Sequence, residues 1–272
     1  ARRAPAMAEL ALRFGYSGVA HVVTLAGAQV MDLASHQCTV APCKLSAPPD
    51  ACGPLRGSLA ASLGLLGVAA GPLLQLRRLT LAVSTPAQFS AASRAAQIQP
   101  GYHVIAVRPL TEETMQLACE KGDFDVISLQ LEEKLPFPLR NKDVGTFLSR
   151  GGFFEIELAP ALRDGGRRRA LLQNAAFLLH ATRGRNVFVS SGAGEPMEMR
   201  SPHDLANFAT VVGLRGALAL RSITDVPHRV LQRAALRRGH AQVVREPSAL
   251  PPDPSGDVDM QDAQKSRPRV RA

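Results

Sequence analysis

Five short apolar runs, separated by amphipathic segments, set the strongest constraint on how this chain folds. They are R-L-T-L-A-V-S at 78–84, Y-H-V-I-A-V at 102–107, D-V-I-S-L-Q-L at 125–131, F-F-E-I-E-L at 153–158 and V-F-V-S at 187–190. Runs rich in β-branched residues and largely uncharged are typical of buried parallel strands. Residues 16–23, Y-S-G-V-A-H-V-V, are a candidate sixth strand upstream.

The segments between these runs carry helix signals. Thr111 is a suitable N-cap for a helix that Gly122 ends, and residues 167–183 carry an apolar face just ahead of Gly184. Alternating strands and helices imply a parallel sheet with right-handed crossovers. A closed barrel and a doubly wound sheet both fit this order. Neither G-x-G-x-x-G nor G-x-x-x-x-G-K-[ST] follows any run, which weakens a nucleotide-binding sheet.

Two parts of the chain lack this pattern. Residues 24–75 are rich in Ala, Gly and Pro, and we expect an irregular low-complexity insertion there, within a single domain that spans 1–245. Residues 59–76 are uncharged and reach the length of a membrane span, but their Gly and Pro residues favour a low-complexity or buried loop. Residues 246–272 are rich in Pro, Asp, Ser and Gln and predict a disordered tail.

The chain carries 32 Lys and Arg against 23 Asp and Glu, a formal net charge of +9 at pH 7. A basic excess favours a polyanionic partner such as nucleic acid, although an ordinary basic protein fits the charge equally well. Within residues 226–244, Arg229, Arg233 and Arg237 recur at helical spacing. On a helix they form a stripe that is either an RNA-facing surface or a solvated face.

Cysteine and histidine spacing does not favour a metal site. His36, Cys38, Cys43 and Cys52 are four potential zinc ligands, but their spacing matches no compact zinc motif, so we expect free thiols. The other histidines form neither H-x-H nor H-E-x-x-H. We therefore expect no metal site and no cofactor. The few cysteines suit a reducing, intracellular compartment.

The loop after the last apolar run resembles an active site at first sight. A serine nucleophile elbow has the pattern G-x-S-x-G, whereas the glycines here follow Ser190 and Ser191. Ser201, His203 and Asp204 contain the residue types of a catalytic triad, but neighbours in one short segment rarely point at one another. Ser201 as N-cap, with Pro202 and then Asp204, instead predicts a capping box that opens a helix.

Two further features leave alternatives open. Glu155 and Glu157 lie two residues apart in one run and so face the same side of the sheet. They are either a catalytic carboxylate pair or a pair covered by arginines. Phe137, between two prolines, is either a core residue or a contact for a partner subunit, and its place after a strand favours the core.

Four stretches taken together resemble one family. They are L-R-R-L-T-L-A-V-S (76–84), Y-H-V-I-A-V-R-P-L-T-E-E-T-M-Q-L-A-C (102–119), D-V-I-S-L-Q-L-E-E-K-L-P-F-P-L-R (125–140) and G-R-N-V-F-V-S-S-G-A-G-E-P-M-E-M-R-S-P-H-D-L-A-N (184–207). The chain is similar over about residues 76–245 to the barrel-like protein subunit, of about thirty kilodaltons, shared by ribonuclease P and RNase MRP in archaea and eukaryotes. The resemblance implies an α/β fold of the TIM-barrel-like type. The barrel is expected to be irregular or incomplete at its N-terminal end, where the family's first strand has no counterpart.

The resemblance also implies a function. The protein is expected to have no catalytic site of its own and to support the RNA subunit, which removes the 5′ leader of precursor tRNA, and in RNase MRP to serve precursor-rRNA processing. The implied partners are the ribonuclease P and RNase MRP RNAs, a small α/β-sandwich protein subunit and other protein subunits, with precursor tRNA touched indirectly and no membrane. The implied location is the nucleus, concentrated in the nucleolus.

Basic residues near the predicted strand ends are candidates for gripping RNA phosphates, because arginine presents a planar fork of donors. They are Arg77, Arg78, Lys134, Arg140, Lys142, Arg167, Arg168, Arg169, Arg183, Arg185 and Arg200. Two rival functions remain. The first is a metal-dependent phosphoesterase on the same barrel, which requires clustered His and Asp at the strand ends. The second is a free-standing RNA-binding module.

Overall fold

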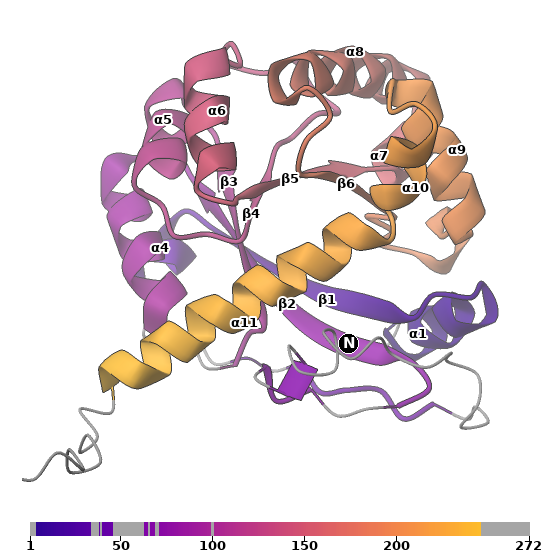
Figure 1. Ribbon diagram of the computed structural model, residues 1–272, viewed down its shortest axis with the longest axis horizontal. Coiled ribbons are helices and arrows are strands. Elements are labelled where there is room, and N and C mark those ends of the chain that lie inside the picture. The colour runs from indigo at the N-terminus through magenta and orange to yellow at the C-terminus, as the bar shows by residue number, and fades with distance from the viewer. Residues whose placement is uncertain are drawn as a thin grey trace, which may run out of the picture.

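The computed structural model describes residues 4–33, 38, 40–45, 63–64, 66–68, 71–98 and 101–245. Six parallel strands form one sheet in the order β1-β2-β3-β4-β5-β6. Their bounds are β1 Gly18–Ala26, β2 Leu74–Val83, β3 Val104–Pro109, β4 Val126–Ser128, β5 Phe153–Glu157 and β6 Val187–Ser190. The sheet curls into a half-barrel, seen in Figure 1 as the arc between the helices. All six predicted strands are confirmed.

Helix α1 precedes β1, and the other helices follow the strands. The helices are α1 Ala4–Arg13, α2 Ala28–Met31, α4 Pro86–Ile98, α5 Glu112–Glu120, α6 Asn141–Ser149, α7 Ala159–Arg163, α8 Gly165–Thr182, η2 Pro196–Glu198, α9 Pro202–Val212, α10 Ala217–Arg221 and α11 Asp225–Arg245. None of the helices in the described ranges is long and apolar enough to cross a membrane.

The strand order decides between the two predicted sheet types. In a doubly wound sheet the order reverses at a switch point, whereas here every strand lies beside its neighbours in the chain. Helices α4, α5, α6, α8 and α9 therefore line the outside of the arc (Figure 1). The barrel-like prediction is confirmed, and the doubly wound alternative is wrong. The barrel is open, with β1 and β6 as its two edges.

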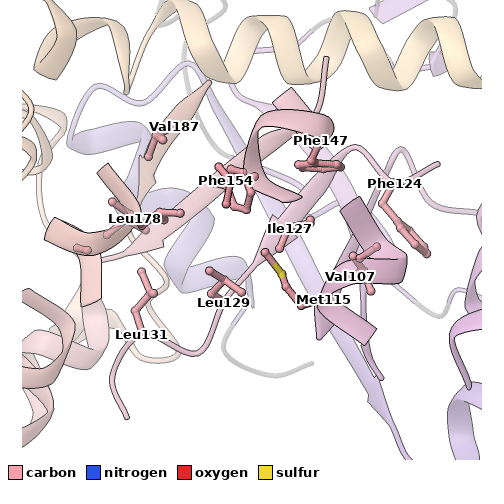
Figure 2. Packing of buried hydrophobic residues seen from close by; sticks show 14 of the residues in the cluster. Val107, Met115, Phe124, Ile127, Leu129, Leu131, Phe147, Phe154, Leu178 and Val187 are labelled. Atoms are coloured by element: carbon pink, nitrogen blue, oxygen red, sulfur yellow. The ribbon is translucent and has the colours of Figure 1, made fainter. Parts of the chain in front are cut away.

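The main core lies between the sheet and these outer helices. Leu79, Ile105, Ile127 and Phe154 project from neighbouring strands and are fully buried. Figure 2 shows Ile127 and Phe154 packed with Phe147 from α6, whose ring meets the ring of Phe154 edge to face at 5.3 Å between centroids. Alternate strand residues face outward, so the residues between them face the hollow of the arc.

Helix α11 covers the amino half of the hollow face. It crosses in front of the sheet in Figure 1 and packs Val230 and Ala234 against Val104, Val126 and Phe153. Two arginines of its stripe, Arg233 and Arg237, turn toward the sheet, whereas Arg229 stays exposed. Arg229 lies over the ring of Phe153 at 5.5 Å, and Arg233 donates to the carbonyl oxygen of Phe124. The stripe is therefore not a solvated face along its whole length, because Arg233 and Arg237 bind the sheet.

Of the remaining local predictions, some are confirmed, one is corrected and others lie outside the described residues. Thr111 is an N-cap and Ser201 forms a capping box, as predicted, and Thr111 proves to form a capping box as well. Phe137 is buried with 4% of its surface exposed, so it belongs to the core. The irregular segment is shorter than 24–75, because β1 runs to Ala26 and β2 begins at Leu74. His36, Cys52 and the tail 246–272 lie outside the described residues.

Candidate nucleic-acid interface

Two arginine–glutamate pairs lie on the hollow face of the sheet, and both of their carboxylates belong to β5. Arg78 donates to both carboxylate oxygens of Glu155, at 2.7 and 2.5 Å. Arg108 lies 3.5 Å from a carboxylate oxygen of Glu157 and also donates to the carbonyl oxygen of Ser128. Of the two interpretations of the glutamate pair, the structure shows the second, a carboxylate pair covered by arginines.

Burial and charge act in opposite directions on these carboxyls. Burial opposes ionisation of Glu155, but the charge and hydrogen bonds of Arg78 outweigh it and hold its pKa below the ordinary value. Burial, and then the charge of Glu155, raises the pKa of Glu157 to about 7, with Arg108 acting against both. This part of a barrel is where active sites usually lie. Here both carboxylates already have cationic partners.

A third buried ion pair fastens α11 to the sheet. Arg237 donates to both carboxylate oxygens of Asp125, with the shortest distance 2.9 Å, and to the carbonyl oxygen of His103. Asp125 is itself fully buried and accepts from the backbone N–H of Ile105 at 2.9 Å. Sequence reasoning missed this pair because its members are 112 residues apart. Among the described residues, no group of three or more His, Cys, Asp or Glu is placed to hold a metal ion.

The loop after β6 connects a strand to a helix. Ser190 ends β6, and Gly192 turns the chain at φ 58° with its backbone against Glu157, where a Cβ would lie 2.8 Å from that residue's Cβ. Ser201 then accepts from the backbone N–H of Asp204, and the Asp204 carboxylate accepts from the Ser201 backbone N–H. His203 is exposed. The capping-box prediction therefore explains these residues.

The candidate RNA-binding residues separate into three groups. At the carboxyl end of the sheet, Lys134, Lys142, Arg167 and Arg169 are exposed and make no side-chain hydrogen bond or ion pair within the described ranges. We call these four residues the carboxyl-end rim. They lie in the β4–α6 loop, the first turn of α6 and the start of α8, which the parallel strands bring to one end of the molecule.

Three other candidates at that end hold the structure together. Arg140 pairs with Glu112 of α5, and Nε of Arg168 donates to the carbonyl oxygen of Ala161 at 2.8 Å. Arg200 donates to the carbonyl oxygens of Met197 and Met199, each at 2.9 Å. Their guanidinium groups are partly occupied by these bonds.

The last four candidates lie apart from the rim. Arg183 and Arg185 are exposed at the opposite, amino end, between α8 and β6. Arg77 lines a pocket at the amino end of β2. Arg78 is 5% exposed and bound to Glu155 within the barrel, so its side chain is not available to an external partner.

A singly wound half-barrel with ion pairs on its hollow face defines a barrel-type α/β protein. The model of the family described as "RNase P subunit p30" matches residues 2–239. The chain belongs to this family.

Individual relatives agree with the family. The chain is 32% identical over 241 residues to Protein GAMETOPHYTE DEFECTIVE 1 of Arabidopsis thaliana, covering 88% of this chain and 41% of that protein. It is 36% identical over 143 residues to the ribonuclease P protein subunit p30 of Mus musculus, covering 53% of each. It is 27% identical over 168 residues to the ribonuclease P/MRP protein subunit RPP1 of Saccharomyces cerevisiae, covering 61% of this chain and 56% of that one.

A solved structure shares the fold. A chain in the cryo-EM structure of archaeal ribonuclease P with mature tRNA superposes with a TM-score of 0.51 at 14% identity, over 68% of this chain and 79% of that chain. The present chain spans about half the length of the curated relatives that it matches.

Proposed function

We propose that this chain is a protein subunit of ribonuclease P that supports the RNA subunit in removing the 5′ leader of precursor tRNA and performs no chemistry itself. The observation that carries the proposal is the family match over residues 2–239. The barrel interior supports a scaffolding role, because Glu155 and Glu157 are held by Arg78 and Arg108 rather than directed at a substrate. That arrangement disfavours the phosphoesterase alternative.

The finer parts of the proposal rest on the relatives. The yeast relative is a ribonuclease P/MRP subunit by name, which supports a second role in RNase MRP and in precursor-rRNA processing. We propose a nuclear and nucleolar location and assembly with the two RNAs, a small α/β-sandwich protein and further protein subunits. Dependence of the chain on the small partner subunit for solubility would count against a free-standing RNA-binding module.

For the RNA contact we propose the carboxyl-end rim. Its four cations are exposed and unpaired within the described ranges, whereas Arg140, Arg168 and Arg200 are engaged with the protein. Phosphate contacts of this kind release counterions, so RNA affinity is expected to fall steeply as salt rises. Aromatic residues make up only 4% of the sequence, which leaves few rings for base stacking and favours recognition of RNA shape and backbone.

Capture of the chain from nuclear extract, with the bound RNA sequenced, tests the subunit role. Recovery of ribonuclease P RNA together with precursor-tRNA cleavage, undiminished by His203→Ala, is the expected result. Phosphatase activity of the purified chain without such RNA would overturn the proposal.

The rim is tested by Arg167→Gln/Arg169→Gln in RNA-binding titrations at several salt concentrations. Loss of two phosphate contacts is expected to lower the slope of log K against log salt by about 2. Arg183→Gln/Arg185→Gln, which removes the same charge from the opposite end, is the matched control. A larger effect from this control would place the RNA contact at the amino end.

A further inference from the structure

A pocket of about 290 Å³ lies at the amino end of β2 and β3, away from the carboxyl-end rim. Arg77 from β2 and His103, which precedes β3, line one wall, and Gln75 and Cys43 lie beside them. Gln75 is held in place, because its amide exchanges two hydrogen bonds with the backbone of Cys43 at 2.7 and 2.8 Å. No Asp or Glu is among the described residues that line the pocket.

The hydrogen bonds of His103 determine where its proton lies. The backbone N–H of Arg77 donates to Nδ1 of His103 at 2.9 Å. A ring nitrogen that accepts carries no hydrogen, so the neutral imidazole carries its hydrogen on Nε2. Burial, and then the charges of Arg77 and Arg238, lowers the pKa of His103 to about 4, which keeps the ring neutral near pH 7.

Two donors consequently face each other in the pocket. Nη2 of Arg77 lies 3.3 Å from Nε2 of His103. A guanidinium only donates, and Nε2 of this tautomer also donates, so the contact lacks an acceptor. Nε of Arg77 is buried and likewise has no hydrogen-bond partner within the described part of the chain. Buried donors of this kind are normally satisfied, so the missing component is an acceptor.

The surrounding charge favours an anionic acceptor. Arg238 of α11 is close enough that Arg77 contributes to lowering its pKa, after burial and Arg237. Arg237 is neutralised by Asp125, but Arg77 forms no ion pair with any described carboxylate. The described residues between 33 and 76 contain no acidic residue. The charge of Arg77 therefore has no counter-ion among the described residues that line the pocket.

We propose that this pocket binds a phosphate group, whose oxygens accept from Nε and Nη2 of Arg77 and from Nε2 of His103. The guanidinium edge matches the spacing of phosphate oxygens. The volume lies near the lower end of small-ligand sites, which are roughly 300–1,000 Å³. The phosphate comes either from an RNA backbone or from free inorganic phosphate, and the RNA source rests on the proposed function.

The first test is titration of the full-length chain with inorganic phosphate against sodium chloride of equal ionic strength. In ¹⁵N-resolved imidazole spectra, we expect the His103 ring to carry its proton on Nε2 and this signal to shift as phosphate is added. At a concentration about five times Kd, mass action predicts a rise in Tm of roughly 2–4 °C. A ring protonated on Nδ1, or an Nε2 signal that phosphate does not move, would overturn the proposal in favour of an ordinary bound water.

Variants identify the ligating side chain. Arg77→Gln removes the positive charge and the two donors at Nε and Nη2, and it is expected to weaken phosphate binding at least tenfold. Arg77→Lys keeps the charge and is expected to retain part of the phosphate affinity. Arg94→Gln, which removes an exposed arginine from α4, is the matched control and is expected to bind phosphate as the original chain does. Equal binding by Arg77→Gln and Arg94→Gln would refute the assignment.

RNA binding separates the two sources. If the pocket holds a backbone phosphate, Arg77→Gln lowers the salt slope of RNA binding by about 1 and free phosphate competes with RNA. If RNA binding is unchanged while phosphate binding is lost, the pocket holds free phosphate. A chain that binds phosphate through Arg77 but captures no ribonuclease P RNA would sustain this site and refute the proposed function.

Discussion

Replacing Arg78 by Met removes the cation from Glu155, a carboxylate buried in the half-barrel. Arg78 is 5% exposed and Glu155 3% exposed, and two hydrogen bonds of 2.7 and 2.5 Å join them. Breaking a buried ion pair by removing one partner costs about 3–5 kcal/mol, because the other charge stays buried without compensation. For a domain stable by about 5–15 kcal/mol, this is a large part of the free energy of unfolding.

The loss in Arg78→Met is expected to depend on pH. Without Arg78, burial and the neighbouring Glu157 raise the pKa of Glu155 above its ordinary value. A carboxyl whose pKa is raised in the folded state favours folding at low pH and loses that contribution as pH rises through the raised value. The free energy of unfolding of Arg78→Met is therefore expected to be closer to that of the original chain at pH 5 than at pH 8.

Urea unfolding followed by far-ultraviolet circular dichroism measures these changes, with an unchanged m-value as the sign that the same surface unfolds. The double variant Arg78→Met/Glu155→Leu removes both charges and is expected to lie within about 1 kcal/mol of the original chain or above it. A loss below about 1 kcal/mol in Arg78→Met at pH 8, or a double variant as unstable as the single one, would refute this reasoning.

Three further predictions concern stability. Glu157 has a folded-state pKa of about 7 against an ordinary 4.5, so its contribution to the free energy of unfolding is present below pH 4.5 and lost as pH rises through 7. The free energy of unfolding of Glu157→Gln should therefore exceed that of the original chain by about 1–3 kcal/mol at pH 8 and by little at pH 5. Equal stability of the two chains at every pH would contradict this. Ser201→Ala removes the N-cap of α9 and should cost about 1 kcal/mol in urea unfolding, with Ser201→Thr as the control that keeps the cap. Phe137→Ala leaves a core cavity and should cost about 3–5 kcal/mol; full stability with loss of a partner subunit would instead make Phe137 a contact residue.

The sequence by itself determined the elements and their order. Short, largely uncharged runs of β-branched composition mark the strands, and the N-cap Thr111 and the capping box at Ser201 mark helix starts, because these signals depend on residues a few positions apart. The repeated alternation then implied a parallel sheet. Strand geometry alone also predicts that Glu155 and Glu157 face the same side of the sheet.

Only the tertiary structure decided which charges meet. Arg78 and Glu155 are 77 residues apart, Arg237 and Asp125 are 112 apart, and nothing in their local sequence indicates either pair. The sequence pattern of the arginine stripe on α11 is the same whether the stripe faces water or the barrel interior. Helical spacing shows that residues share a face, but it does not show what that face contacts. The donors of Arg77 and His103 likewise converge only once β2 and β3 pair, since hydrogen bonds between distant segments depend on the packing of the whole sheet.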